Sequence, residues 1–185
     1  MLMLEQRIQQ HFFDSADLRY QSAETLSRPI ADAAQAVVGA LTAGGKLLLC
    51  GSGGGAALAC HAAAIFVGRF ERERPPLAAL ALGAEPSWTQ QLQALGQPGD
   101  VLLIVQGGGA AELFAAAVEV AHAQEMTVLA LAQAGAGWLG TLAETDVAVA
   151  LPNGRPARLL ELQLLVLHAL ADAVDLQLLG EQEEP

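Results

Sequence analysis

Two glycine-rich turns hold the residues of this chain that could bind a small anion. Each turn follows a short apolar run and leads into an alanine-rich stretch. A turn that opens a helix presents unpaired backbone N–H groups at the positive end of the helix dipole, which favours phosphate. Ser52 carries the only hydroxyl in either turn, so the backbone would hold any anion. The candidate ligand residues are Gly51, Ser52, Gly53, Gly54, Gly55, Gln106, Gly107, Gly108 and Gly109.

Two nucleotide-binding interpretations of these turns are weak. The first turn matches the GxG part of a dinucleotide-binding fingerprint, but no acidic residue follows the second apolar run where a ribose-binding carboxylate would stand. Neither turn continues into the Gly-Lys-Ser/Thr sequence of a triphosphate-binding loop. The turns therefore predict a phosphate site that is not a nucleoside triphosphate loop.

Alternating apolar runs and helical patterns position the two turns. Because the runs are apolar on both faces, they predict a parallel sheet with helices on each side, a three-layer α/β/α sandwich of the doubly wound, flavodoxin-like type. Ligands bind such sheets at the carboxyl ends of the strands, where both turns lie. The five strand-length runs cover residues 47–50, 77–82, 101–105, 127–132 and 146–151.

Helical patterns flank the predicted sheet. A first helix is expected over residues 1–26 and a second from Pro29, which suits a first helical turn. The last helix, about residues 155–179, is apolar almost all round, so we expect a neighbouring chain to bury it. The predicted single domain comprises a helical N-terminal arm (1–44), a doubly wound core (45–152), a C-terminal helix (153–180) and an acidic tail (181–185).

Composition narrows the classes of partner. Apolar residues make up 53% of the chain and charged ones 16%, an excess that predicts burial between subunits. The net charge is −11 with Lys46 as the single lysine, so direct nucleic-acid binding is disfavoured. Cys50 and Cys60 are expected as buried thiols in the reducing cytoplasm. The glycines within residues 47–67 argue against a membrane span.

An ordered set of motifs resembles the SIS (sugar isomerase) family, nearest to its phosphoheptose isomerases and the DnaA initiator-associating protein. The matching stretches are residues 46–61, 68–75, 99–103 and 158–168, and the resemblance covers essentially the whole chain. Gly-Arg-Phe-Glu-x-Glu-Arg-Pro, at residues 68–75, is the most specific stretch. The resemblance implies a phosphosugar site at the glycine turns, and we expect a homotetramer assembled through the terminal helices.

The resemblance also exposes departures from the isomerase pattern. In phosphoheptose isomerases, catalysis is attributed to a glutamate and a histidine on two helices, with a metal ion among them. This chain keeps His61 and His168, but Ile65 replaces the glutamate, Leu160 a glutamine and Gln163 a histidine. An isomerase needs a base within hydrogen-bond reach, which isoleucine cannot supply. Two histidines fall short of a zinc site, so we expect no metal and no cofactor.

Each candidate residue also has a purely structural interpretation. His61 and His168, the only catalytic candidates, could be histidines of a subunit interface. Glu161 could simply pair with Arg158. The mixed charges of residues 69–74 are typical of a solvated approach to a strand.

Three parts of the family's site have lost side chains together, including the shortened loop 83–96, and this favours a non-catalytic role. We therefore expect a homotetrameric adaptor that binds the replication initiator DnaA, with avidity from its four copies. Leu178 and Leu179, at the end of the last helix, are expected as its exposed contact. Two alternatives stay open: a sedoheptulose 7-phosphate isomerase with an unusual residue set, and a phosphosugar sensor that uses backbone amides alone.

Overall fold

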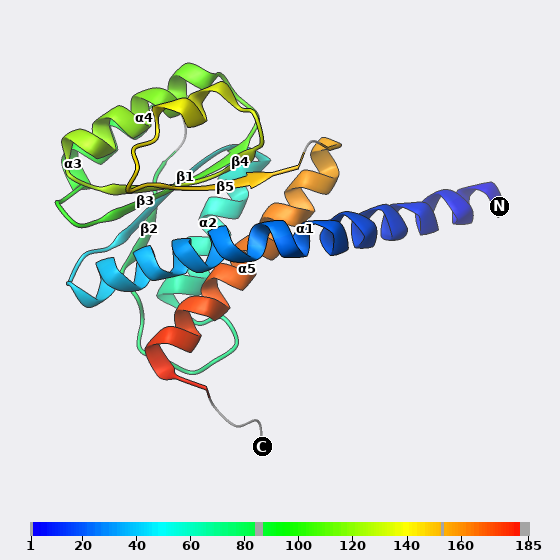
Figure 1. The fold of residues 1–185 in the computed structure, drawn as a ribbon, viewed down its shortest axis with the longest axis horizontal. Helices are drawn as coiled ribbons and strands as arrows, with labels where there is room; N and C mark the ends of the chain where they lie inside the picture. The colour runs from blue at the N-terminus through cyan, green and yellow to red at the C-terminus, as the bar shows by residue number, and fades with distance from the viewer. Residues whose placement is uncertain (1, 84–86, 153, 182–185) are drawn as a thin grey trace.

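A five-stranded parallel sheet with helices on both faces forms the body of the protein (Figure 1). The computed structural model describes residues 2–83, 87–152 and 154–181. The strands are β1 (Leu47–Gly53), β2 (Ala79–Ala81), β3 (Val101–Gly107), β4 (Thr127–Gln133) and β5 (Val147–Leu151). The helices are α1 (Leu2–Thr42), α2 (Gly54–Val67), α3 (Trp88–Leu95), α4 (Ala111–Ala123) and α5 (Pro156–Leu179), with a short 3-10 helix η1 (Gly137–Thr141).

The strand order β2-β1-β3-β4-β5 confirms the doubly wound, flavodoxin-like fold. The chain changes its direction of winding between β1 and β3, which is where ligands bind in such sheets. These two strands pair in parallel along their whole length, so Ser52 lies level with Gln106 and Gly53 with Gly107. The two glycine turns therefore leave neighbouring strands at the same edge.

Side chains of the strands alternate between two separate cores. In β1, Leu47 and Leu49 pack toward α1, α2 and α5, whereas Leu48 packs toward α3 and α4. Burial on both faces explains the continuous apolar runs of the central strands. The run at residues 77–82 yields only the three-residue β2, because it lies at the sheet edge directly after Pro75-Pro76.

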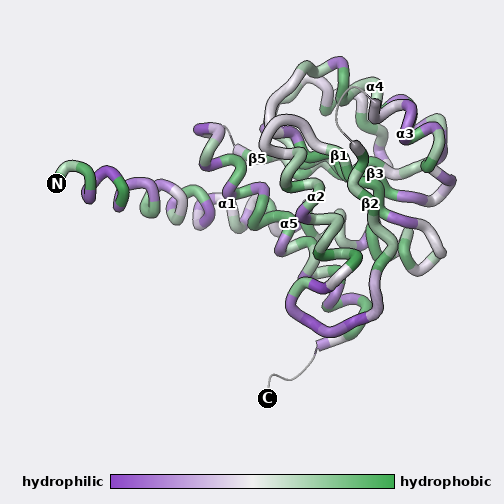
Figure 2. Tube along the Cα trace, turned by 180° about the vertical axis from the view of Figure 1, so that it is seen from behind, coloured by the Kyte–Doolittle hydropathy of each residue, from purple (hydrophilic) through white to green (hydrophobic). Residues whose placement is uncertain are grey.

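Helix α1 is one continuous helix of 41 residues, so the prediction of two N-terminal helices is wrong. Proline usually bends or ends a helix, yet Pro29 lies inside α1. Leu26 and Ala33, on either side of it, are buried in the same core, and this packing outweighs the local preference. The first half of α1 projects beyond the body, and Figure 2 shows apolar positions along it. Its exposed large apolar side chains are Leu2, Met3, Leu4, Ile8, Phe12, Phe13 and Tyr20.

Helix α5 agrees closely with the predicted last helix. It packs beside α1 and α2, but Leu165 and Leu176 remain 43% and 37% exposed. The expectation that Leu178 and Leu179 form an exposed pair is wrong, because both are half-buried and Leu178 packs against the main core. Apart from Glu181, the predicted acidic tail lies outside the described residues. Within the described ranges, no helix combines the length and apolarity that a membrane crossing requires.

Candidate active site

The two glycine turns touch each other through their backbones. A Cβ atom on Gly55 would lie 2.2 Å from the carbonyl oxygen of Val105, and one on Gly107 would lie 2.3 Å from the amide nitrogen of Gly55. Gly51 is equally confined, because its Cβ would lie 2.2 Å from the carbonyl oxygen of Gly55. Only glycine permits this approach, which joins the ends of β1 and β3 into one surface of backbone groups.

Ser52 links the two turns instead of facing the solvent. Its hydroxyl donates to the carbonyl oxygen of Gly108 at 2.5 Å and accepts from the amide of Gly107 at 3.2 Å. The residue is only 1% exposed. The sequence suggested Ser52 as the one hydroxyl contact for an anion, whereas in the structure this hydroxyl fixes the relative position of the turns.

Helices α2 and α4 both begin at this edge without a side-chain cap. Gly53 precedes α2 and Ala110 precedes α4, and neither makes a capping hydrogen bond through a side chain within the described chain. The N–H groups of a first helical turn have no partner inside the helix. With both helix dipoles directed here, the arrangement suits a phosphate group, as the turns predicted.

A cleft of about 180 Å³ opens beside the second turn, against the first turns of α5. Gln163 lies at this cleft with its Nε2 donating to the backbone oxygen of Gln106 at 2.7 Å. Leu160 covers the first turn, since a Cβ on Gly54 would lie 2.7 Å from its Cδ1. The residues that line the cleft are Gln106, Gly107, Gly108, Gln133, Leu151, Gly154, Pro156, Leu159, Leu160 and Gln163.

His61 of α2 and His168 of α5 come together across the two helices. Their Nε2 atoms lie 2.8 Å apart, and the ring of Phe70 packs 5.0 Å from that of His168, centroid to centroid. One Nε2 must donate and the other accept, so the pair shares one proton. Burial, followed by the charge of His61, lowers the pKa of His168, while Glu71 opposes the shift. The neutral imidazole is therefore the favoured form of His168.

The donor atoms near this pair do not fit a metal ion. Zinc takes three or four protein ligands, and in the described ranges no three His, Cys, Asp or Glu residues gather in a way that could hold a metal. Ile65, one turn beyond His61 on α2, is apolar, as is Leu160. The chain offers an imidazole pair here, and the absence of zinc stays a prediction.

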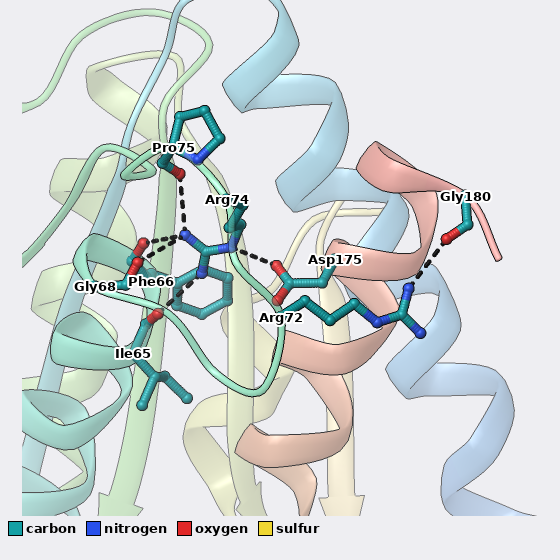
Figure 3. Close-up of polar contacts among 8 residues, drawn as sticks. All are labelled: Ile65, Phe66, Gly68, Arg72, Arg74, Pro75, Asp175 and Gly180. Carbon is teal, nitrogen blue, oxygen red and sulfur yellow. Dashed lines mark hydrogen bonds and ion pairs between the residues drawn. The ribbon is translucent and has the colours of Figure 1, made fainter. Parts of the chain in front are cut away.

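Arg74 ties together the two helices that carry the histidines (Figure 3). Its Nε donates to Asp175 of α5 at 2.6 Å, and both side chains are 1% exposed. Its Nη2 and Nη1 donate to the carbonyl oxygens of Ile65 and Phe66, at 2.9 and 2.8 Å, near the end of α2. The interpretation of residues 69–74 as a solvated charged run is therefore wrong for Arg74. Asp175 of α5 and the carbonyl groups at the end of α2 enclose the Arg74 side chain.

Glu161 pairs with Arg158 at 2.7 Å, as its structural interpretation predicted. It also accepts a hydrogen bond from Ser15 of α1 at 2.6 Å. Arg158 in turn donates to the carbonyl oxygen of His11 at 2.6 Å. These contacts fasten the arm to the start of α5. In the shortened loop 83–96, residues 84–86 lie outside the described part of the chain.

Comparison with known proteins gives one consistent family. Residues 11–133 match the sequence family described as SIS domain. The phosphoheptose isomerase of Methylibium petroleiphilum is 56% identical over 99% of both chains, and that of Azoarcus sp. is 42% identical over 96% of this chain and 98% of its own.

Solved structures agree with the sequence matches. Phosphoheptose isomerases from Neisseria gonorrhoeae and Francisella tularensis give TM-scores of 0.82 and 0.85, with 32% and 33% identity. They cover 93% and 95% of this chain and 98% and 99% of their own chains.

These matches overturn the expectation of a non-catalytic adaptor for DnaA. The relatives that are similar along their whole length are named as isomerases, and nothing in these matches points to replication initiation. The expectation rested on the three parts of the family's site that have lost side chains together, the replacement of a glutamate by Ile65 among them. It did not foresee that His61 and His168 meet directly, with their Nε2 atoms 2.8 Å apart.

Proposed function

This chain belongs to the SIS domain family, on its phosphoheptose isomerase branch, and from that premise we propose that it interconverts the aldose and ketose forms of a sugar phosphate. The substrate that we propose is sedoheptulose 7-phosphate, after the activity for which the relatives are named. The observation that carries the proposal is the pairing of His61 and His168 at 2.8 Å on the helix that starts from the first glycine turn and the helix that lines the cleft.

In this proposal the glycine turns hold the phosphate. The first-turn N–H groups of α2 and α4 and their helix dipoles provide the favourable charge, at the switch point between β1 and β3. His61 follows Gly54 along α2 by about 10 Å, from the helical rise per residue. An extended seven-carbon sugar phosphate can reach from the turns to the histidines.

The histidine pair would move the proton. Isomerisation removes a proton from the carbon beside the carbonyl, passes through an enediol and returns a proton to the neighbouring carbon. His168 is suited to accept that proton because burial favours its neutral form. Isomerisation also requires that a second proton pass between the two substrate oxygen atoms. His61, which shares with His168 the proton between their Nε2 atoms, would carry out that transfer.

We also propose that the working form is a homotetramer built through α1 and α5. The projecting half of α1 and residues such as Leu165 expose apolar surface that another subunit would cover. Cys60 is exposed, so the expectation of a buried thiol is wrong at this position, whereas Cys50 is buried as expected. An exposed thiol fits a reducing compartment, and the cytoplasm remains our proposed location.

The deciding experiment combines turnover with binding. We expect purified protein to convert sedoheptulose 7-phosphate, followed by NMR, and His168→Asn to lower kcat at least about a hundredfold, as expected for loss of a general base. His11→Asn, at a histidine of α1 that is not part of the His61–His168 pair, serves as the control. Saturable binding without turnover by the unmodified protein would instead support the sensor. If the unmodified protein shows no binding and no turnover, the proposal is contradicted.

A further inference from the structure

Gln163 carries a buried polar atom that the protein itself does not use. The residue is 2% exposed on α5, yet its Oε1 atom has no hydrogen-bond partner among the described residues. Buried polar groups are nearly always paired, and an unpaired one costs stability. The same residue lines the cleft beside the second glycine turn. Gln163 therefore brings an acceptor without a protein partner to the wall of the cleft.

The chemistry of the missing partner follows from the contact that Gln163 already makes. Its other amide atom, Nε2, lies 2.7 Å from the backbone oxygen of Gln106, which can only accept. The NH₂ group must therefore face Gln106, and Oε1 is fixed as an acceptor. Such an atom binds an O–H or N–H donor, whereas the acceptor oxygens of a phosphate dianion gain nothing from it.

The cleft places Gln163 next to the groups proposed to bind phosphate, and Gln106 adds a second buried side-chain acceptor without a partner among the described residues. The turns offer N–H donors, which suit the charged end of a sugar phosphate. On the α5 side of the cleft, Leu159 and Leu160 are apolar and Gln163 supplies the buried acceptor. A ligand with an anionic end and a hydroxylated chain would match both parts at once.

We propose that Gln163 recognises a hydroxyl group of the bound sugar phosphate and so selects hydroxylated phosphate esters over bare or alkyl phosphates. This inference rests on the proposed phosphosugar site, and it assigns to Gln163 a specificity that the catalytic histidines do not provide. It also gives a use to the polar side chain that lies next to two leucines on α5.

The test compares three probes by isothermal titration calorimetry: sedoheptulose 7-phosphate, heptyl phosphate and inorganic phosphate. Heptyl phosphate has the same chain length but no hydroxyl groups. We expect the unmodified protein to prefer the sugar phosphate over heptyl phosphate. Gln163→Met should weaken sugar phosphate binding about three- to tenfold, the value of one neutral hydrogen bond, and leave inorganic phosphate binding within about twofold. Gln93→Met, at an exposed site on α3, is the matched control.

Each outcome is decisive. Equal weakening of all three probes would assign Gln163 a structural role and overturn the inference. Unchanged binding in Gln163→Met would also overturn it and indicate that a buried water satisfies Oε1. If this variant does not fold, the unmodified protein still provides a test. Equal affinity of the unmodified protein for the sugar phosphate and for heptyl phosphate would be enough to overturn the inference. Failure of the unmodified protein to bind any of the probes would overturn the phosphosugar site itself, and the inference with it.

Discussion

Single residues decide whether this site can transfer a proton. His168 is half-buried against Phe70 and lies 2.8 Å from His61, so a second positive charge at this position is disfavoured. Both effects lower the pKa of His168, burial more than charge. His168, the base that we propose, therefore stays neutral at pH values where a solvated histidine would begin to take up a proton.

This pKa shift predicts how stability depends on pH. In the unfolded chain His168 takes up a proton near its ordinary pKa of about 6.5, but in the folded chain only at lower pH. The unfolded state thus binds more protons in the interval between these values, so the free energy of unfolding should fall as the pH drops from about 6.5 through the lowered pKa. Urea titrations across this range measure it. His168→Gln should flatten the dependence, and an equally steep slope in that variant would contradict the assignment.

Arg74 makes the second prediction at this scale. Removing one member of a buried ion pair leaves the other charged and without compensation, so Arg74→Met should lower the free energy of unfolding by about 3–5 kcal/mol. Adding Asp175→Leu should recover part of this loss, because the orphaned carboxylate disappears. Arg69→Met, at an exposed residue of the same loop, should change stability by less than about 1 kcal/mol. Equal effects of Arg74→Met and Arg69→Met would show that burial does not matter here.

At the scale of elements, the site depends on two helices that start at one edge of the sheet. Helix α2 begins directly after β1 and α4 begins after residues 108–110 that follow β3, and both lack side-chain caps in the described structure. Their first turns contribute to one positive region because β1 and β3 are neighbours in register. The phosphate binding that we propose is therefore a property of the strand–turn–helix unit and not of any one side chain.

A charge placed in this region tests the idea. Gly54→Asp should weaken sedoheptulose 7-phosphate binding more than about tenfold, because the new carboxylate would occupy the proposed phosphate position and repel the phosphate. Gly54→Asn has the same shape without the charge and meets the same contact with Leu160. Calorimetry on both variants separates charge from shape. A similar loss in both would attribute the effect to crowding by Leu160.

The sequence predicted the elements better than the contacts between them. Glycine patterns located the turns, and apolar runs located β1, β3, β4 and β5, because both signals are local. The continuity of α1 through Pro29 was missed, since burial of its flanking residues outweighs the local preference. The burial of Arg74 was missed because its partner Asp175 is 101 residues away. The direct pairing of His61 with His168 depends likewise on how α2 and α5 pack.

At the scale of the whole molecule, the projecting arm predicts assembly. Phe12 and Phe13 on α1 are 72% and 59% exposed in a single chain, an arrangement that association would bury. Light scattering should report four chains at micromolar concentration. The double variant Phe12→Asp, Phe13→Asp should shift the mass to smaller species, and Gln9→Asp, at an exposed polar site, should not. A monomeric unmodified protein would contradict the proposed tetramer.

The backbone contact between the two turns also constrains how this protein can evolve. Gly51, Gly55 and Gly107 have no space for a side chain, so a substitution at any of them disrupts the fold, whatever the ligand. Changes in substrate preference must accumulate at the neighbouring positions, such as Gln106 and Ala110, where side chains are already present. The same geometry that makes the anion site thus separates an unchanging frame from a variable lining. Residues around this edge can therefore change while the frame on which new specificity can arise stays in place.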